Sequence, residues 1–195
     1  MARRNDHSKE ELKQLVIDSA RRLVDKLGPG GVTARRIADD MGYTPGTLYQ
    51  HFANLNDIFL HVNAANLGQL ERQIAAAGES GSTPVERILE MAYTYLGYAQ
   101  SHPHRFALMF TSHVPHGEDA PEHIQVRVDS LFALVTRQLG LIWPDRTPEM
   151  LALTARTLWS AVHGVVSLSV RDQLFTRRWQ ADRRMLEELI VRFFS

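Results

Sequence analysis

The chain has 195 residues, of which 44% are hydrophobic and 23% are charged. These proportions are typical of a globular protein and exclude disorder as the dominant state. The 22 Lys and Arg residues equal the 22 Asp and Glu residues in number, so any binding to nucleic acid must come from a local surface and not from net charge. The lack of cysteine excludes a disulfide scaffold, a thiolate zinc site and a cysteine nucleophile.

Neither a membrane span nor an export signal is indicated. No stretch approaches the roughly 20 apolar residues that cross a bilayer. The first residues, Met-Ala-Arg-Arg-Asn-Asp-His, lack the apolar segment of a signal peptide. We therefore expect a cytoplasmic protein with no membrane partner.

Apolar residues recur at helical spacing along nearly the whole chain, and the alternation typical of strands is almost absent. Capping residues, glycine and proline divide this pattern into about nine helices. Their expected ranges are 9–27, 34–41, 45–52, 55–77, 84–101, 103–111, 121–141, 148–170 and 179–194. The sequence therefore predicts an all-α fold.

The first three helices form the pattern of a helix-turn-helix. Thr33 caps the second helix, Gly42 ends it, and Thr44 and Pro45 begin the third. Two helices joined by so tight a turn are typical of helix-turn-helix domains. We expect this domain at residues 1–54 and a larger helical domain at 55–195, with the helix over 55–77 connecting the two.

The third helix has an inner and an outer face. Leu48 and Phe52, four residues apart, are expected to be buried. The outward-facing residues are Pro45, Gly46, Tyr49 and Gln50. Such a face suits the major groove of DNA, Arg35 has the donor geometry for guanine, and Thr47 and His51 suit phosphate oxygens. The alternative is a three-helix subdomain with a solvated polar face.

The run Val-Thr-Ala-Arg-Arg-Ile-Ala-Asp-Asp-Met-Gly-Tyr-Thr-Pro-Gly-Thr-Leu-Tyr-Gln-His-Phe over 32–52 resembles the DNA-binding signature of the TetR/AcrR family of bacterial transcriptional regulators. A second segment, Leu-Trp-Ser-Ala-Val-His-Gly-Val-Val-Ser-Leu over 158–168, is similar to the Trp-x-x-x-His-Gly subgroup of that family. The two segments lie in the order that the family has. On this basis the chain is identified as a member of the family.

The resemblance implies an all-helical homodimer whose N-terminal domains bind a palindromic DNA operator. The C-terminal domains would dimerise and hold a small organic effector, and repression is the commoner outcome. The residues that match groove-facing positions are Arg35, Pro45, Gly46 and Tyr49. Those on the phosphate side are Thr33, Thr47, Gln50 and His51, with Thr44 at the start of the helix.

One position departs from the family pattern. Members often carry Lys three residues after the Phe of Tyr-x-His-Phe, and this chain has Leu55 there, preceded by Asn54. A phosphate contact is therefore missing, although the Asn54 amide is able to donate one. We expect a weaker dependence of DNA affinity on salt, because each lost contact flattens the logarithmic slope by about 0.9.

The helix expected at 148–170 is apolar on two sides. One stripe consists of Leu151, Ala155, Leu158, Val162 and Val166, and the other of Trp159, Val162 or His163, Val166 and Val170. A helix apolar on two sides must be buried on both, which favours a two-fold interface with a second copy. The expected interface residues are Leu158, Val162, Val166, Leu186, Leu189, Ile190 and Phe193. A larger monomeric core is the alternative.

Aromatic and methionine side chains gather in the middle helices, where an apolar wall with a few polar tips suits a small organic ligand. The candidate pocket residues are Met91, Tyr95, Tyr98, Phe106, Met109, Phe110, Phe132, Trp159 and His163. At each single position an ordinary core role is the commoner one, because methionine and aromatic residues at helical spacing usually fill a core. No fixed charge stands in these stripes, so we expect a neutral or weakly polar effector and no cofactor.

Metal binding and catalysis are the two other classes of function that the sequence raises. Five of the nine histidines lie between residues 102 and 123, and His113 and His116 have chelating spacing, so a metal-responsive regulator is the alternative. We assign no metal ligand, because these residues straddle loops. No nucleophile elbow, nucleotide-binding loop or His-Glu-x-x-His motif occurs, so an enzyme is not expected.

Overall fold

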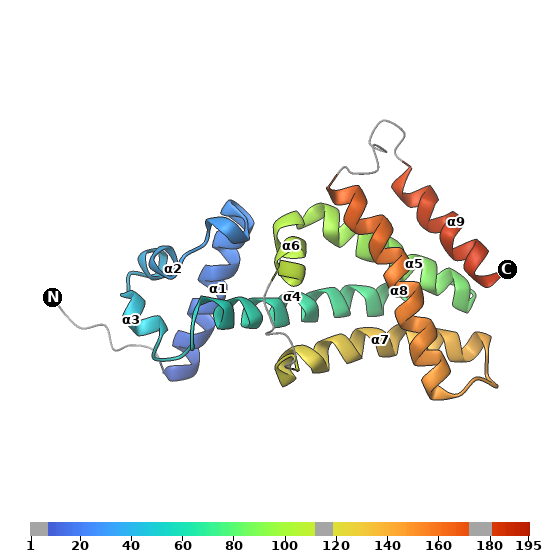
Figure 1. Ribbon diagram of the computed structural model, residues 1–195, viewed down its shortest axis with the longest axis horizontal. Helices are drawn as coiled ribbons and strands as arrows, with labels where there is room; N and C mark the ends of the chain where they lie inside the picture. Colours follow the sequence, from blue (N-terminus) through green and yellow to red (C-terminus); the bar gives the residue numbers. More distant parts are fainter. Residues whose placement is uncertain (1–7, 112–118, 172–180) are drawn as a thin grey trace. The chain divides into compact units, whose positions relative to one another are not determined.

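The computed structural model describes residues 8–111, 119–171 and 181–195. Within these residues the chain is all-helical, as predicted, with nine α-helices and no strand (Figure 1). The helices are α1 (Lys9–Leu27), α2 (Ala34–Met41), α3 (Pro45–Leu48), α4 (Leu55–Ala77), α5 (Pro84–Ser101), α6 (Pro103–Thr111), α7 (Glu122–Ile142), α8 (Pro148–Val170) and α9 (Asp182–Phe194). A short 3₁₀ helix, η1 (Pro29–Gly31), follows α1. In the described ranges, no helix is both long and apolar enough to cross a membrane.

The chain divides into two compact units. Unit 1 comprises Met1–Asn66 and His104–Ile124, and unit 2 comprises Leu67–Pro103 and Gln125–Ser195. Helices α4 and α7 each contribute residues to both units. Most of α6, which the sequence assigns to the C-terminal domain, packs in unit 1. The prediction of a connecting helix over 55–77 matches the bounds of α4.

Helix α1 begins with the capping box formed by Ser8 and Glu11, in which each side chain bonds the other residue's backbone N–H. Its buried face is formed by Val16, Ile17, Ser19, Ala20 and Val24. Leu15 and Leu27 of the same helix are apolar as well, but they are more than one-third exposed.

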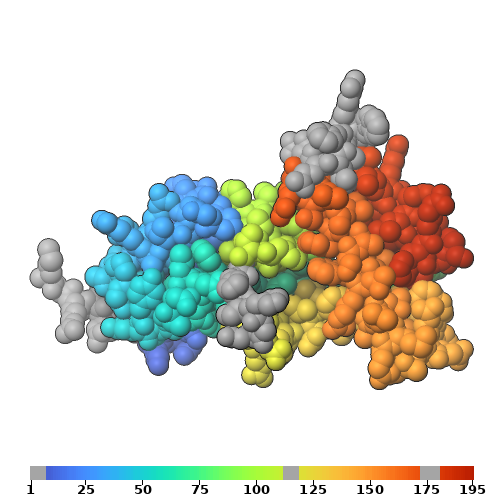
Figure 2. All heavy atoms as spheres, viewed as in Figure 1, coloured from blue at the N-terminus to red at the C-terminus, as the bar shows by residue number. Residues whose placement is uncertain are grey.

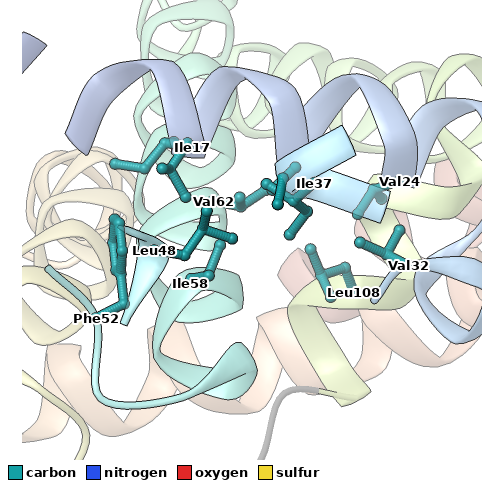
Figure 3. Close-up of a cluster of buried hydrophobic side chains, with 12 residues drawn as sticks. Ile17, Val24, Val32, Ile37, Leu48, Phe52, Ile58, Val62 and Leu108 are labelled. Carbon is teal, nitrogen blue, oxygen red and sulfur yellow. The ribbon is translucent and has the colours of Figure 1, made fainter. Parts of the chain in front are cut away.

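The core of unit 1 lies beneath the helix-turn-helix. Ile37 from α2, Leu48 from α3 and Ile58 from α4 are fully buried there, and Phe52 is 2% exposed. Figure 3 shows these side chains converging with those of α1 and with Leu108 of α6. A three-helix domain this small has little core of its own, and α4 and α6 supply the missing apolar surface.

Polar contacts tie α6 into unit 1. The Arg105 guanidinium forms a two-pronged ion pair with the Asp25 carboxylate near the end of α1. The Nδ1 atom of His104 lies 2.9 Å from the Asp25 carbonyl oxygen. From α4, the Asn63 amide donates a hydrogen bond of 3.1 Å to the Leu108 carbonyl. These contacts explain why α6 belongs to the same unit as α1, although 79 residues separate Asp25 from His104.

Unit 2 is built on α5, α8 and α9, which pack against one another. Helix α5 begins at a capping box formed by Thr83 and Glu86, and α8 is capped by Thr147. Two ion pairs join α4 to α7 in this unit, from Glu71 to Arg127 at 3.1 Å and from Glu79 to Arg137 at 2.9 Å. Both α4 and α7 therefore run in the same direction past each other.

Candidate DNA-binding surface and effector region

The turn between α2 and α3 has the geometry that its sequence predicts. The Thr33 hydroxyl accepts a hydrogen bond from the Arg36 N–H and caps α2. Gly42 ends α2 in the left-handed conformation at φ 72°, which favours glycine. The Tyr43 N–H then bonds the Ala38 carbonyl at 2.9 Å. The direction in which α3 leaves the turn is thus set by backbone bonds around a glycine.

Helix α3 is shorter than predicted, because it ends at Leu48 and not at Phe52. The N–H groups of His51 and Phe52 still bond the Leu48 carbonyl, so the chain continues as a turn. Gly46 and Thr47 are weak helix formers, which explains the early end. Thr44 occupies the capping position, but its hydroxyl bonds the Thr47 hydroxyl at 3.1 Å and not a backbone N–H.

The predicted inner and outer faces of α3 are present. Leu48 and Phe52 are buried, whereas the Tyr49 side chain between them is 49% exposed. The other exposed members of the predicted DNA-binding set are Thr33, Arg35, Thr44, Pro45, Gly46 and Gln50, and Thr47 and His51 are half-buried. Figure 2 shows the atoms of α2 and α3, in light blue and cyan, on the surface of unit 1. All nine residues therefore lie within 33–51 and are exposed or half-buried.

Arg35 is held only loosely. Its side chain is 86% exposed, and its one ion pair, to Asp39 on the next turn of α2, spans 3.9 Å. The neighbouring Arg36 differs, since it donates to the Gly31 carbonyl behind the helix. Of these two adjacent arginines, Arg35 is therefore the one whose side chain points into solvent with only a long ion pair.

The packing at the start of α4 shows what Leu55 does at the position where family members often carry Lys. Leu55 is half-buried and packs against the core of unit 1, so this position strengthens the core in place of a phosphate contact. The Asn54 side-chain oxygen accepts a hydrogen bond of 2.9 Å from the Asp57 N–H and caps α4. Asn54 itself is exposed.

Two family models match the chain. Residues 16–62 match the model described as bacterial regulatory proteins, tetR family. Residues 88–194, more than half of the chain, match the model described as tetracyclin repressor-like, C-terminal domain. The chain belongs to the TetR family of bacterial regulatory proteins. It is therefore a DNA-binding transcriptional regulator of the TetR type.

Relatives of this TetR-family chain are described as HTH-type transcriptional regulators. An uncharacterized HTH-type transcriptional regulator of Mycobacterium tuberculosis is 26% identical over 158 residues, which cover 81% of this chain and 70% of the relative. The HTH-type transcriptional regulator AcrR of Shigella flexneri is 32% identical over 79 residues, or 39% of this chain and 37% of the relative.

Solved structures share the whole fold. A protein with unknown function from Rhodococcus sp. RHA1 has a TM-score of 0.75 at 18% identity, covering 99% of this chain and 97% of that one. The transcriptional regulator FadR of Bacillus subtilis, in complex with stearoyl-CoA, has a TM-score of 0.69 at 15% identity, covering 93% and 97%. At these identities the likeness concerns the fold alone.

The candidate effector residues fall into both units. Phe106, Met109 and Phe110 lie on α6 in unit 1, where Phe110 is 44% exposed. The remaining six, in unit 2, are Met91, Tyr95, Tyr98, Phe132, Trp159 and His163. Met91 and both tyrosines are buried, with exposures of 3–6%.

Four of the unit 2 residues form a continuous cluster, which we call the aromatic cluster: Tyr95, Phe132, Trp159 and His163. The Tyr95 hydroxyl lies 2.9 Å from His163 Nδ1. The Trp159 ring stacks on His163 with centroids 5.0 Å apart, and Phe132 meets Trp159 edge-on at 5.8 Å. Burial raises the pKa of the Tyr95 hydroxyl well above its usual value, and burial together with Arg171 lowers the pKa of His163. Both groups are therefore neutral at pH 7.

Two buried polar residues of unit 2 were missed by the sequence reasoning. Gln138 on α7 is 1% exposed and Ser169 on α8 is 7% exposed. Neither the Gln138 Oε1 atom nor the Ser169 hydroxyl has a hydrogen-bond partner among the described residues. A signal was present for Gln138, because it directly precedes Leu139 on the inner, apolar side of its helix.

The predicted dimer residues need correction. Leu158, Val162 and Val166 of α8 and Leu186 and Ile190 of α9 are buried within the chain itself. They pack in the interior of unit 2 and are not free to contact a second copy. Leu189 and Phe193 are half-buried. The apolar residues that these two helices do expose include Leu153, at 68%, and Val191, at 57%.

The metal alternative finds no support. The described parts of the chain contain no group of three His, Asp or Glu side chains that could hold a metal ion. His113 and His116, the pair with chelating spacing, lie outside the described residues.

Proposed function

We propose that this TetR-type regulator is a repressor that binds a palindromic operator as a homodimer and is released by a small, neutral or weakly polar organic effector. The observation that carries the DNA-binding part is the exposed face of α3, with Pro45, Gly46 and Tyr49 outside and Leu48 and Phe52 buried beneath them. A buried anchor under an exposed, small-residue face lets the helix approach base edges without losing its support.

Arg35 and Tyr49 supply the base contacts in this proposal. The guanidinium of Arg35 matches the two acceptors of guanine, and Tyr49 offers a ring and a hydroxyl. The phosphate-side residues are Thr33, Thr44, Thr47, Gln50 and His51, whose short polar groups flank the same face.

The deciding experiment is selection of bound duplexes from a random pool, followed by affinity measurements on the recovered site. We expect a palindrome with half-sites about one or more helical turns apart, and Tyr49→Ala should bind it about tenfold or more weakly. Leu27→Ala, another exposed apolar position in unit 1, is the control and should bind as the parent does. Recovery of no enriched duplex would overturn the proposal.

The effector part rests on the aromatic cluster of unit 2. It presents apolar ring faces beside neutral hydrogen-bonding groups on Tyr95 and His163, and the unpartnered Gln138 Oε1 atom is an acceptor in the same unit. Pockets for small organic ligands combine these features. The Trp-x-x-x-His-Gly resemblance places Trp159 and His163 at the matching positions of that subgroup, in keeping with a ligand role.

Release follows from differential binding. An effector that prefers a form of the dimer with wrongly spaced recognition helices shifts the population away from the DNA-bound form. We expect neutral aromatic and aliphatic compounds, screened by thermal shift, to stabilise the protein and lower its operator affinity. Trp159→Ala should abolish the response to an active compound while operator affinity without compound is kept. If Trp159→Ala responds as the parent does, the cluster is not the effector site.

The exposed side of α8 is the surface we assign to the dimer. Leu153, Thr157, Ser160 and Gly164 lie along one outer face, and small side chains there permit close helix packing. A Cβ atom added at Gly164 meets nothing within 4 Å, and the same holds for Gly97 on α5. Both glycines therefore tolerate a side chain in the monomer.

Because Gly164 and Gly97 have the same open surroundings, substitutions at the two positions form a matched test of the dimer surface. By light scattering, the 22.1 kDa chain should run as a dimer, Gly164→Arg as a monomer and Gly97→Arg as a dimer. A dimeric Gly164→Arg protein would exclude this face, and a monomeric parent would exclude the dimer altogether.

A further inference from the structure

Two histidines from distant parts of the sequence stack against each other in unit 1. His61 lies on α4 and His123 in the first turn of α7. Their rings are 4.5 Å apart between centroids and within 5° of parallel. We call this pair the histidine stack. Neither the proposed DNA-binding residues nor the aromatic cluster includes this pair.

The stack touches the support of the recognition helix. The Phe52 ring, buried directly after α3, meets His61 edge-on with centroids 5.4 Å apart. Lys13 of α1 lies over the Phe52 ring, with its Nζ atom 5.8 Å from the ring centroid. A change of charge on His61 is therefore felt at the residue that anchors the exposed face of α3.

Burial and the neighbouring groups together favour the neutral form of His61. Burial is the largest cause of its lowered pKa, followed by His123 and then by Lys13. Asp57, one turn earlier on α4 with its Oδ1 atom 3.9 Å from His61 Nε2, acts in the opposite direction. Asp57 is also engaged by the Ala53 N–H at 2.9 Å. The acid group thus compensates only part of the cost of a positive imidazole.

The partner ring is held in the interior of unit 1. His123 lies in the first turn of α7, and its Nε2 atom is buried with no hydrogen-bond partner among the described residues.

We propose that the histidine stack is an acid-sensitive latch, which holds the first turn of α7 against α4 while His61 is neutral and opens when His61 becomes charged. This inference rests on the proposed function in one respect, that opening weakens operator binding through Phe52. Helices α4 and α7 both continue from unit 1 into unit 2, so the latch couples acidity to the two helices that link the units.

The lowered pKa of His61 sets the direction in which stability depends on pH. The folded form binds fewer protons than the unfolded chain below the ordinary histidine pKa of 6.5. Stability is therefore complete above that pH and is lost as the pH falls toward the lowered pKa. His163 in unit 2 has the same direction of shift, so the test must isolate the stack from it.

His123→Phe isolates it, because this variant keeps a flat ring against His61 and removes the imidazole that lowers the pKa of His61, while His163 is unchanged. By NMR titration of the histidine ring protons, the pKa of His61 should rise by about half a unit or more in His123→Phe. His104→Gln, at an exposed histidine of the same unit, should leave the pKa of His61 unchanged. His123→Gln, which removes the ring, serves if the Phe variant does not fold. An unchanged His61 pKa in the folded variant would overturn the latch.

Operator binding gives the second readout, on a fluorescein-labelled duplex recovered by selection. Between about pH 7.5 and 5.5, His123→Phe should lose up to about threefold more affinity than the parent, since a His61 pKa raised by half a unit leaves about three times more of the charged form. Equal acid responses of parent and variant would refute the coupling to DNA. Recovery of no duplex at neutral pH would instead overturn the proposed function, and the NMR titration would still decide on the latch.

Discussion

The α3 face in unit 1 and the aromatic cluster in unit 2 differ in how much of the chain is needed to build them. The α3 face is contained within residues 33–51, and its outward residues alternate with buried anchors on two short helices. The aromatic cluster takes Tyr95, Phe132 and Trp159 from α5, α7 and α8. A surface made by one local motif keeps its geometry as long as its anchors are buried, whereas a cluster drawn from three helices depends on how those helices pack.

The largest expected effect comes from removing an anchor beneath the α3 face. Phe52→Ala should lower the free energy of unfolding by about 3–5 kcal/mol, because it empties a buried aromatic site. Phe110→Ala, at a 44% exposed phenylalanine of the same unit, should cost much less. Urea unfolding of both variants measures the difference. Equal losses would mean that burial of Phe52 does not support the α3 face.

The next largest effect is expected on the exposed DNA-binding surface. Arg35→Ala should weaken binding to the selected operator by about 1–3 kcal/mol, as expected for loss of a guanine contact, and leave stability unchanged. Arg192→Ala removes an exposed arginine that also pairs with an acid four residues away, Glu188 on α9. This control should bind DNA normally, measured by fluorescence anisotropy. A parent-like Arg35→Ala protein would remove Arg35 from the site.

The aromatic cluster should respond differently from the α3 face. Tyr95→Phe removes the hydroxyl that meets His163 and should cost about 1 kcal/mol of stability. Operator affinity without effector should stay the same, because the change lies in unit 2. Thermal unfolding and anisotropy on one preparation test both halves. A large fall in DNA affinity would show that the two regions are not separable.

A smaller effect concerns the contact between α1 and α2. Asp40 accepts hydrogen bonds from Ser19 at 2.6 Å and Arg22 at 2.8 Å, and these partners, Ser19 first, lower its pKa. Its stabilisation is present above the ordinary carboxyl pKa and is lost as the pH falls through the lowered value. Asp40→Asn should flatten this acid response and cost about 1 kcal/mol or less, since solvent screens the pair. Unfolding curves at several acidic pH values provide the check.

The smallest change tests the departure from the family pattern. Leu55→Lys should steepen the logarithmic dependence of DNA affinity on salt by about 0.9, the value for one added phosphate contact. It should also cost some stability, because Leu55 packs against the core of unit 1. An unchanged salt slope would indicate that this position does not face the DNA backbone.

Sequence patterns were reliable where local chemistry decides the structure. The bounds of α4, α5 and α8 agree with their predicted ranges, because proline, threonine and glycine mark helix ends through backbone bonds within one turn. The same local rules identified Leu48 and Phe52 as buried and Tyr49 as exposed. The resemblance of residues 32–52 to the TetR family was confirmed, whereas the Trp-x-x-x-His-Gly subgroup of residues 158–168 stays a prediction.

Only the tertiary structure decided which apolar side chains of a helix meet the chain's own core. Periodicity shows that Leu158 and Val162 lie on an apolar stripe, but it does not show what covers the stripe, and both proved to be buried in unit 2. In the same way, no spacing rule brings His61 to His123 or α6 to α1, since these partners are 62 residues or more apart in sequence. Helix ends depend on hydrogen bonds between near neighbours, whereas packing depends on the free energy of the whole chain.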